Sequence, residues 1–572
     1  MKAIRRIMAL LLCMCMLFSA LSIHSSAAAA GTYGPYEYDN LVVKSGPVEL
    51  KKSATMNGVQ KAFYNALNAA GSALLRVICD LYTSPRDWKD VSEFDGSGFL
   101  PGRETYATSA AKENEWRVGY GSRSVIPTDF QPGMYYIGRN VETIKPVGVL
   151  DDNRVRAAAF DDGSGEGLVI FAVVDSLGVT RADTLSVRER ILEWAKAENI
   201  PIASINLSAT HSHSALDAQG VATEFFYKLF VTGWKSLLNI RKDKKLEEAE
   251  AFKAFYLNAA VEAIQDAVRD MRPGKLFYAR VDTSAYAQDK RGLIAAADLP
   301  KAAVLRFDPT DGSAGLYLAD VACHPTSFSA DHRMLTADYI AYMEQRVEEK
   351  TGCRFLFAQG ASGMVSRRDV GIQTDTLPED ERLGAETRYM GRVFADLILA
   401  ADMEELPPVL NVRHTQFLHE PTNYILALAV KAQLVNDQVY TSNGGRKLHV
   451  VIEEGYVEFG GRVGLCLFPV ELYPEVFYGA QTINDGDHQK LLWENSDWTY
   501  PVPVELAPRE GIDLYAMHLT NDSMGYCVLD NNFAFFGHII GDGDADEALS
   551  MGKYTASTLV TEFKKLMDSL AA

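Results

Sequence analysis

Two histidines one residue apart stand in a short stretch of small and hydroxylated residues. The stretch SATHSHSAL places His211 and His213 just after an apolar run at 202–207, in a chain with only 11 histidines. In an extended backbone, residues i and i+2 face the same side about 6 to 7 Å apart. One imidazole can therefore hold a metal ion while the other faces the molecule that the ion binds. Taken alone, the pair is compatible with a metal site or with two surface histidines in a loop.

Two further segments have the same setting. The strand-like segment 316–323 (LYLADVAC) leads directly to His324. The segment 355–366 (FLFAQGASGMVS) is an apolar strand that enters a glycine-bearing turn, where a substrate can approach the backbone closely. In open α/β sheets, reactive groups gather at the carboxyl ends of strands, because loops converge there. The sequence therefore predicts that these segments form one rim.

The elements that must position this rim are strands alternating with helices from residue 116 onwards. Apolar periodicity and turn residues predict a strand-helix-strand unit, then a long helix and a hairpin, then three more helices. The expected ranges are strand 168–174, helix 181–199, strand 202–207, helix 246–271 ended by Arg-Pro-Gly at 272–274, hairpin 303–325, and helices 336–350, 383–401 and 551–570.

Five short motifs follow one another along the chain: ATHSHS (209–214), ACHPTS (322–327), FAQGASGMVS (357–366), FPVE (468–471) and LTNDSMGY (519–526). In these motifs and in their order the chain resembles the neutral ceramidase family, which are zinc amidases that cleave the N-acyl bond of ceramide. The resemblance implies an α/β (mixed α+β) fold with mixed β-sheets flanked by helices, in a catalytic domain over residues 116–572. Unlike full-length family members, the chain is expected to have no C-terminal Ig-like domain.

Carried over to these positions, the resemblance makes His211, His324, Glu471 and Tyr526 the ligands of one zinc ion per chain. Two neutral imidazoles and a carboxylate are common ligands of catalytic zinc, whereas a tyrosine ligand is unusual. Such an ion activates water for attack on an amide carbonyl. The alternatives are a solvated strand-end carboxylate for Glu471 and a half-buried aromatic for Tyr526.

The resemblance also gives roles to two candidate catalytic residues. His213, beside a ligand but not needed as one, would position or protonate the departing amine. Ser366 would lie near the substrate headgroup, with a plain turn residue as the alternative. It is not expected to act as a nucleophile, because activated water makes an acyl-enzyme unnecessary.

The sequence departs from the family pattern on the substrate side. The family's Gly-Asp-Val-Ser-Pro-Asn reads GMVSRR here, so Met364 replaces the acid, and Arg367 and Arg368 replace Pro-Asn. Val470 stands where the family has glycine. These changes keep all the metal-ligand positions, but they leave the identity of the substrate open. The alternatives to ceramide or a related N-acyl lipid are a different N-acyl or ester substrate, and a non-catalytic secreted binding protein on the same scaffold.

The composition of the chain limits where the protein can act and which partners it can bind. Residues 1–30 have the basic start, apolar stretch and small terminal residues of a cleaved signal peptide, so a secreted protein is expected. The formal charge of −19 argues against nucleic acid and anionic membranes as partners. Residues 31–115 form an extension with one amphipathic helix, 59–82, that could pack on the body or make transient contact with a lipid surface. The oligomeric state stays open.

The seven cysteines do not read as a disulfide framework. Two lie inside the leader, and the remaining five are widely spaced and mostly within apolar runs. The compartment would permit disulfides, but an odd number with this spacing does not predict them. Most of these cysteines are expected to be small buried hydrophobic residues.

Overall fold

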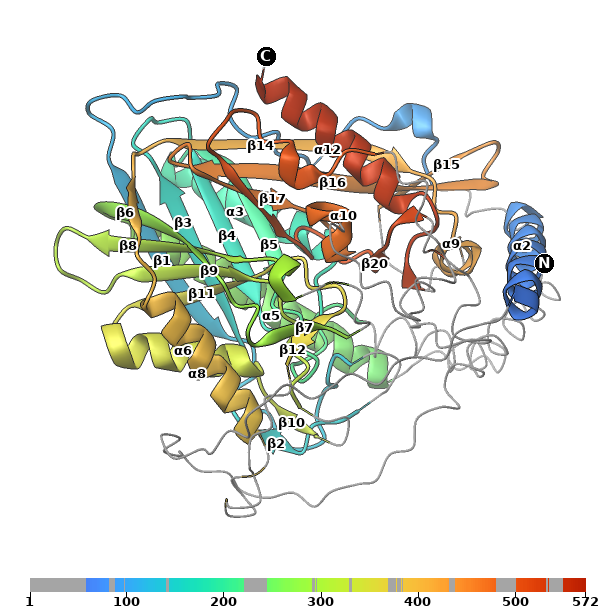
Figure 1. Cartoon of the computed structure of the whole chain (residues 1–572), viewed down its shortest axis with the longest axis horizontal. Helices are drawn as coiled ribbons and strands as arrows, with labels where there is room; N and C mark the ends of the chain where they lie inside the picture. The colour runs from blue at the N-terminus through green and yellow to red at the C-terminus, as the bar shows by residue number, and fades with distance from the viewer. Residues whose placement is uncertain are drawn as a thin grey trace.

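The structure is a computed structural model, and the predicted leader (1–30) and residues 31–57 of the predicted extension lie outside the residues that it describes. Figure 1 shows the arrangement of the elements. The described residues are 58–81, 88–96, 98–139, 144–220, 244–290, 294, 296–328, 332–368, 377, 382, 384–431, 438–479, 500–530, 533 and 549–571.

A nine-stranded mixed sheet forms the centre of the protein. Its strands run in the order β11-β9-β8-β6-β1-β3-β4-β5, and β13 pairs with β6 off this path. The bounds are β1 (Trp116–Ser124), β3 (Arg154–Asp161), β4 (Leu168–Val174), β5 (Ile202–Ala209), β6 (Arg272–Val281), β8 (Ala302–Pro309), β9 (Leu316–Val321), β11 (Arg354–Gln359) and β13 (Glu404–Leu406).

A second sheet has five strands in the order β14-β16-β17-β19, with β15 paired to β16. Its bounds are β14 (Leu410–His419), β15 (Val439–Ser442), β16 (Lys447–Phe459), β17 (Val463–Leu467) and β19 (Asp513–Met517). Three short pairs complete the strands of the described residues: β2 (Gly148–Val149) with β10 (Met334–Leu335), β7 (Ala287–Asp289) with β12 (Val365–Arg367), and β18 (Glu471–Leu472) with β20 (Tyr526–Cys527).

The helices lie around these sheets. Their bounds are α2 (Gly58–Leu81), α3 (Arg181–Glu198), α5 (Lys244–Arg269), α6 (Tyr339–Thr351), α8 (Ala385–Leu399), α9 (Tyr424–Lys431), α10 (Pro474–Tyr478) and α12 (Thr555–Ala571), with short 3-10 turns η1 (Val91–Glu93), η4 (Ala296–Asp298) and η6 (Pro503–Glu505).

Strand periodicity explains how the layers stack. Along β4, Val169 and Phe171 face a core that also contains Phe459 of the second sheet, whereas Ile170 and Ala172 face a core formed with α3 and α5. Successive strand residues point to opposite faces, so an all-apolar strand serves two cores at once. Helices α6 and α8 cover β9 and β11, and α12 covers the outer face of the second sheet (Figure 1). The result is a helix-sheet-sheet-helix arrangement, which confirms the predicted mixed α/β fold.

The predicted strand-helix-strand unit is β4-α3-β5, in which β4 and β5 pair in parallel. Helix α3 begins with a capping box, in which the Thr180 side chain accepts from the Asp183 backbone and the Asp183 side chain accepts from that of Thr180. It ends at Asn199 in the left-handed conformation. The predicted hairpin is the antiparallel pair β8 and β9. Residues 272–274, expected only to end a helix, already begin strand β6.

The nine-stranded sheet curls until its edges approach each other. Strand β11, at one edge, contacts β3, β4 and β5 at the other. Right-handed strand twist accumulates across many strands and permits such curling. Consequently the carboxyl ends of β5, β9 and β11 reach one region although β5 lies far from the other two in strand order.

Helix α2 lies where the amphipathic helix 59–82 was expected. One side packs against α9 through the buried Cys79 and the half-buried Leu75 and Ile78. Another side exposes a row of apolar residues that includes Phe63 (63% exposed) and Leu74 (61% exposed). None of the described helices combines the length and apolar character needed to cross a membrane.

The cysteines outside the leader are free, as expected. Cys79, Cys323, Cys466 and Cys527 are buried, and Cys353 is half-buried.

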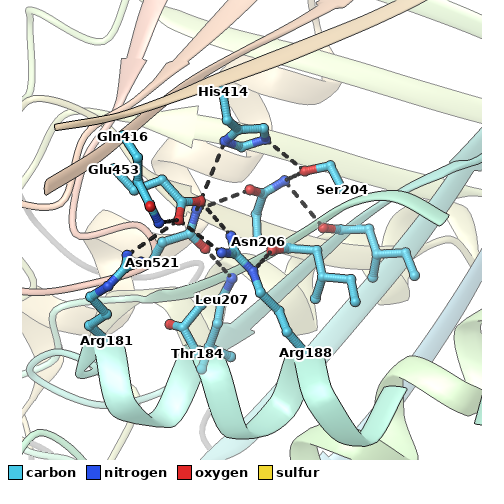
Figure 2. Close-up of polar contacts among 12 residues, drawn as sticks. Arg181, Thr184, Arg188, Ser204, Asn206, Leu207, His414, Gln416, Glu453 and Asn521 are labelled. Atoms are coloured by element: carbon cyan, nitrogen blue, oxygen red, sulfur yellow. Dashed lines mark hydrogen bonds and ion pairs between the residues drawn. The ribbon is translucent and has the colours of Figure 1, made fainter. Parts of the chain in front are cut away.

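A buried ionic network joins helix α3 to both sheets (Figure 2). The Arg188 guanidinium donates to both carboxylate oxygens of Glu453, at 2.9 and 2.7 Å, and Arg181 lies 3.3 Å from the same carboxylate. Asn521 donates to Glu453 (3.4 Å) and exchanges two hydrogen bonds with the backbone of Leu207 in β5 (2.6 and 3.1 Å). The network therefore fixes β5 relative to the loop that contains Asn521.

We expect Glu453→Gln to lower the free energy of unfolding by about 3–5 kcal/mol, because it leaves buried Arg188 and Arg181 without their counter-charge. Chemical denaturation measures this loss. Lys447→Ala on the same strand breaks an exposed ion pair with Glu420 and should cost less than about 1 kcal/mol. Equal costs in the two variants would contradict the role of the network.

The stability of wild type and that of Glu453→Gln should depend differently on pH. Burial alone would raise the pKa of Glu453, but the charge and hydrogen bonds of Arg188 lower it to about 2. A folded-state pKa below the ordinary value of 4.5 contributes stability above that value, and the contribution is lost as pH falls toward 2. The difference between wild type and Glu453→Gln should therefore shrink over this interval.

Candidate metal centre

Three predicted ligands meet at one point. His211 follows β5, His324 follows β9, and Glu471 begins β18. The Nε2 atoms of the two histidines are 3.0 Å apart. The Glu471 carboxylate lies 3.3 Å from His211 Nε2 and 3.0 Å from His324 Nε2. All three side chains are buried, so these groups face one another rather than solvent.

Backbone contacts aim the His211 ring. Its Nδ1 lies 2.6 Å from the carbonyl oxygen of Leu177. A carbonyl only accepts, so Nδ1 carries the hydrogen, and the lone pair of the neutral ring is on Nε2, which faces His324 and Glu471. His211 itself has a φ of +66°, in the left-handed region that residues with a Cβ rarely adopt. The backbone is thus held in an uncommon conformation that delivers the ring to the cluster.

The electrostatics keep the groups in the protonation states that a cation requires. Burial and the neighbouring charges of His211 and Lys290 lower the pKa of His324, although Glu471 opposes this. Burial opposes ionisation of Glu471, but the two imidazoles lower its pKa below the usual range. A neutral imidazole and an ionised carboxylate are the forms that bind metal ions.

A metal ion fits this arrangement. Glu471 Oε1 is buried and makes no hydrogen bond, although His324 Nε2 is only 3.0 Å away. Buried polar atoms are normally paired, so a carboxylate oxygen left unpaired beside an imidazole nitrogen marks a place for a further partner. Nitrogen and carboxylate atoms suit zinc and several other divalent ions. The cluster could therefore hold a divalent metal ion.

His213 stands at the open side of the cluster. Its Nε2 is 3.5 Å from His211 Nε2. One ring nitrogen from each of His211, His213 and His324 lies within 4.8 Å of the other two, so these three histidines could hold a metal ion. It is the only one of the three histidines that is half-buried rather than buried. Burial, followed by the two neighbouring imidazoles, lowers its pKa well below 6.5. His213 is therefore neutral near pH 7 and accessible to a molecule that approaches the cluster.

Ser366 and Tyr526 adjoin the ligands through the backbone. Ser366 lies in β12, and it forms a parallel bridge with His324. Its hydroxyl donates to the Arg367 carbonyl at 3.4 Å. Tyr526 is the register partner of Glu471 in the parallel pair of β18 and β20. Paired strand residues face the same side of a sheet, so Tyr526 and Glu471 share a face.

Two groups that adjoin the cluster were missed by the sequence analysis. The Leu177 carbonyl leaves no side-chain signal, because any residue offers a carbonyl. His518 is fully buried and follows β19, and its ring centroid lies 6.2 Å from that of His211. The run DLYAMH has the strand-then-histidine setting that identified His324. The same signal could have singled out His518 from the sequence.

The sequence matches no protein-family model and no curated protein. Solved structures that share the fold include two ceramidases. The neutral ceramidase from Pseudomonas aeruginosa aligns with a TM-score of 0.57 and 15% sequence identity, over 80% of this chain and 75% of that chain. A ceramidase complexed with C2 aligns with a TM-score of 0.55 at the same identity and coverage. The chain therefore has a neutral-ceramidase-like fold.

We expect the purified protein to bind about one divalent ion per chain, and His324→Ala and Glu471→Gln to lose it, because each removes one converging ligand atom. Elemental analysis after dialysis against zinc measures the content. His449→Ala is the control, because its imidazole lies 2.9 Å from the Ser442 hydroxyl in the β15–β16 pair. Full metal content in both ligand variants would place the ion elsewhere.

Proposed function

We propose that this protein is a secreted, zinc-dependent amide hydrolase that cleaves the N-acyl bond of ceramide or a related N-acyl lipid. The convergence of His211, His324 and Glu471 within 3.0 to 3.3 Å carries the proposal. Two imidazoles and a carboxylate form a common ligand set of catalytic zinc and leave room for water or substrate. The fold shared with ceramidases supports the same reaction class.

Zinc would be held by His211, His324 and Glu471, with Tyr526 as a fourth ligand beside Glu471. An ion in this position supplies an activated water molecule and polarises the amide carbonyl. The protein contributes a buried setting in which the ligand side chains are oriented beforehand by β5, β9 and β18. Preorganised ligands avoid the cost of reorganisation during the reaction.

His213 is the proton carrier in this proposal. Hydrolysis adds water across the C–N bond, so one proton must leave the attacking water and one must reach the departing amine. A neutral, half-buried His213 can accept a proton at Nε2 and release it to the amine nitrogen. The products are a fatty acid and an amine.

Ser366 would contact the substrate rather than attack it. It bridges to His324 through the backbone, so it lies next to a residue of the metal centre. The neighbouring Arg367 pairs with Glu386. An ion pair at this point, where the family has Pro-Asn, favours a substrate headgroup that differs from ceramide. A different N-acyl or ester compound is therefore the second candidate, and a non-catalytic binding protein the third.

The partners follow from charge and surface. A chain with a formal charge of −19 does not suit nucleic acid. The exposed apolar residues of α2, among them Phe63 and Leu74, suit transient contact with a neutral lipid surface. The N-terminal leader directs the protein out of the cytoplasm in this proposal.

Zinc-loaded wild type should release fatty acid from a short-chain ceramide or from another member of a panel of N-acyl lipids, N-acyl amino acids and esters. His213→Gln should lower kcat by about 10²–10⁴-fold, because it removes the proton carrier, with zinc content unchanged. Fluorogenic turnover and elemental analysis on the same samples measure both. Bound zinc without turnover of any panel member would favour the binding-protein alternative.

Ser366→Ala should change KM more than kcat and keep kcat within about tenfold of wild type, because a substrate-contacting hydroxyl supplies binding rather than bond formation. Steady-state kinetics on the best substrate of the panel decide this. A fall in kcat of about 10⁴-fold or more, or a trapped acyl-enzyme in rapid-quench mass spectrometry, would make Ser366 a nucleophile instead.

A further inference from the structure

His518 occupies a position behind the ligand cluster that no ligand role explains. It is fully buried, and its ring lies at 77° to that of His211 with centroids 6.2 Å apart. Both of its ring nitrogens face groups outside the ligand cluster, the Leu472 backbone at Nδ1 and the Ser362 hydroxyl at Nε2. A buried imidazole without a ligand role needs another reason for its polar atoms.

Its hydrogen bonds fix the tautomer. The backbone N–H of Leu472 donates to His518 Nδ1 at 3.1 Å. Because that N–H can only donate, Nδ1 carries a lone pair and the hydrogen of the neutral ring is on Nε2. Nε2 lies 3.4 Å from the Ser362 hydroxyl, and the His518 backbone N–H donates to the Gln359 carbonyl at 3.0 Å. The residue thus connects β18 to the turn after β11.

The contact with Leu472 is next to a metal ligand. Glu471 N–H donates to the Gly525 carbonyl and Tyr473 N–H donates to the Cys527 carbonyl, both on the β20 side. Hydrogen bonds alternate along a strand, so the Leu472 N–H points to the opposite side. His518 Nδ1 is its acceptor there. One strand of two residues is therefore held from both sides, and Glu471 is one of the two.

We propose that His518 is a positioning residue: by accepting the Leu472 N–H at Nδ1 it fixes the backbone of β18 and thereby aims the Glu471 carboxylate at His211 and His324. The inference rests on the metal centre proposed above. An apolar side chain of similar size would fill the same space in the core but would leave the Leu472 N–H unpaired. The acceptor atom, rather than the ring volume, is the feature that matters.

The test compares two nearly isosteric variants. His518→Asn keeps an acceptor close to the place of Nδ1, and His518→Leu does not. Zinc affinity is measured on the full chain by competition with a chromophoric chelator, and thermal unfolding in EDTA monitors the fold. His518→Leu should bind zinc about tenfold more weakly or worse, and His518→Asn should recover most of the loss. Ser362→Ala, which removes only the Nε2 contact, should stay within about threefold of wild type.

Other results would overturn the inference. Equal losses in the Asn and Leu variants, or a Leu variant that binds zinc as tightly as wild type, would leave His518 a packing residue only. If His518→Leu does not fold, His518→Gln replaces it, because its longer side chain places the amide near Nε2 rather than Nδ1 and should not restore affinity. Wild type without zinc binding would overturn the metal centre and this inference together. Zinc binding without hydrolysis would overturn only the proposed activity, because affinity still compares the variants.

Discussion

The site depends on the meeting of two strand ends that the sheet order places far apart. His211 follows β5 at one edge of the nine-stranded sheet, whereas His324 follows β9 next to the opposite edge, with β8, β6, β1, β3 and β4 between them. Their Nε2 atoms are nevertheless 3.0 Å apart. This distance requires the curl that brings β11 into contact with β5. The second sheet packs against the face inside the curl, so both sheets together define the position of the cluster.

Buried polar groups convert this packing into a fixed geometry. Asn521 binds the backbone of β5 and the carboxylate of Glu453, and His518, three residues before it, binds β18 and the turn after β11. One short segment therefore contacts the elements that carry His211 and Glu471. Buried hydrogen bonds in a low dielectric are strong when satisfied and costly when broken, which favours a single arrangement.

The sequence predicts local features of this protein better than long-range ones. Apolar runs with clear ends predict β4, β5 and the β8–β9 hairpin, because burial on a strand or helix face leaves a periodic pattern. Four site residues, His211, His213, His324 and Glu471, are indeed brought together. Three features could not be predicted from the sequence, because each depends on contacts between distant segments. They are the curl of the sheet, the role of the Leu177 carbonyl and the partners of Glu453. The prediction for residues 272–274 was incomplete, because Pro and Gly can end a helix and can also stand at the first positions of a strand.

The left-handed backbone at His211 affects which residues this position tolerates. For a residue with a Cβ that conformation costs about 1–2 kcal/mol, whereas glycine adopts it without penalty. Glycine would relieve this strain, but it would also remove a buried imidazole and its hydrogen bond to the Leu177 carbonyl. The residue that presents its Nε2 atom to the cluster is thus also one at which the backbone is strained.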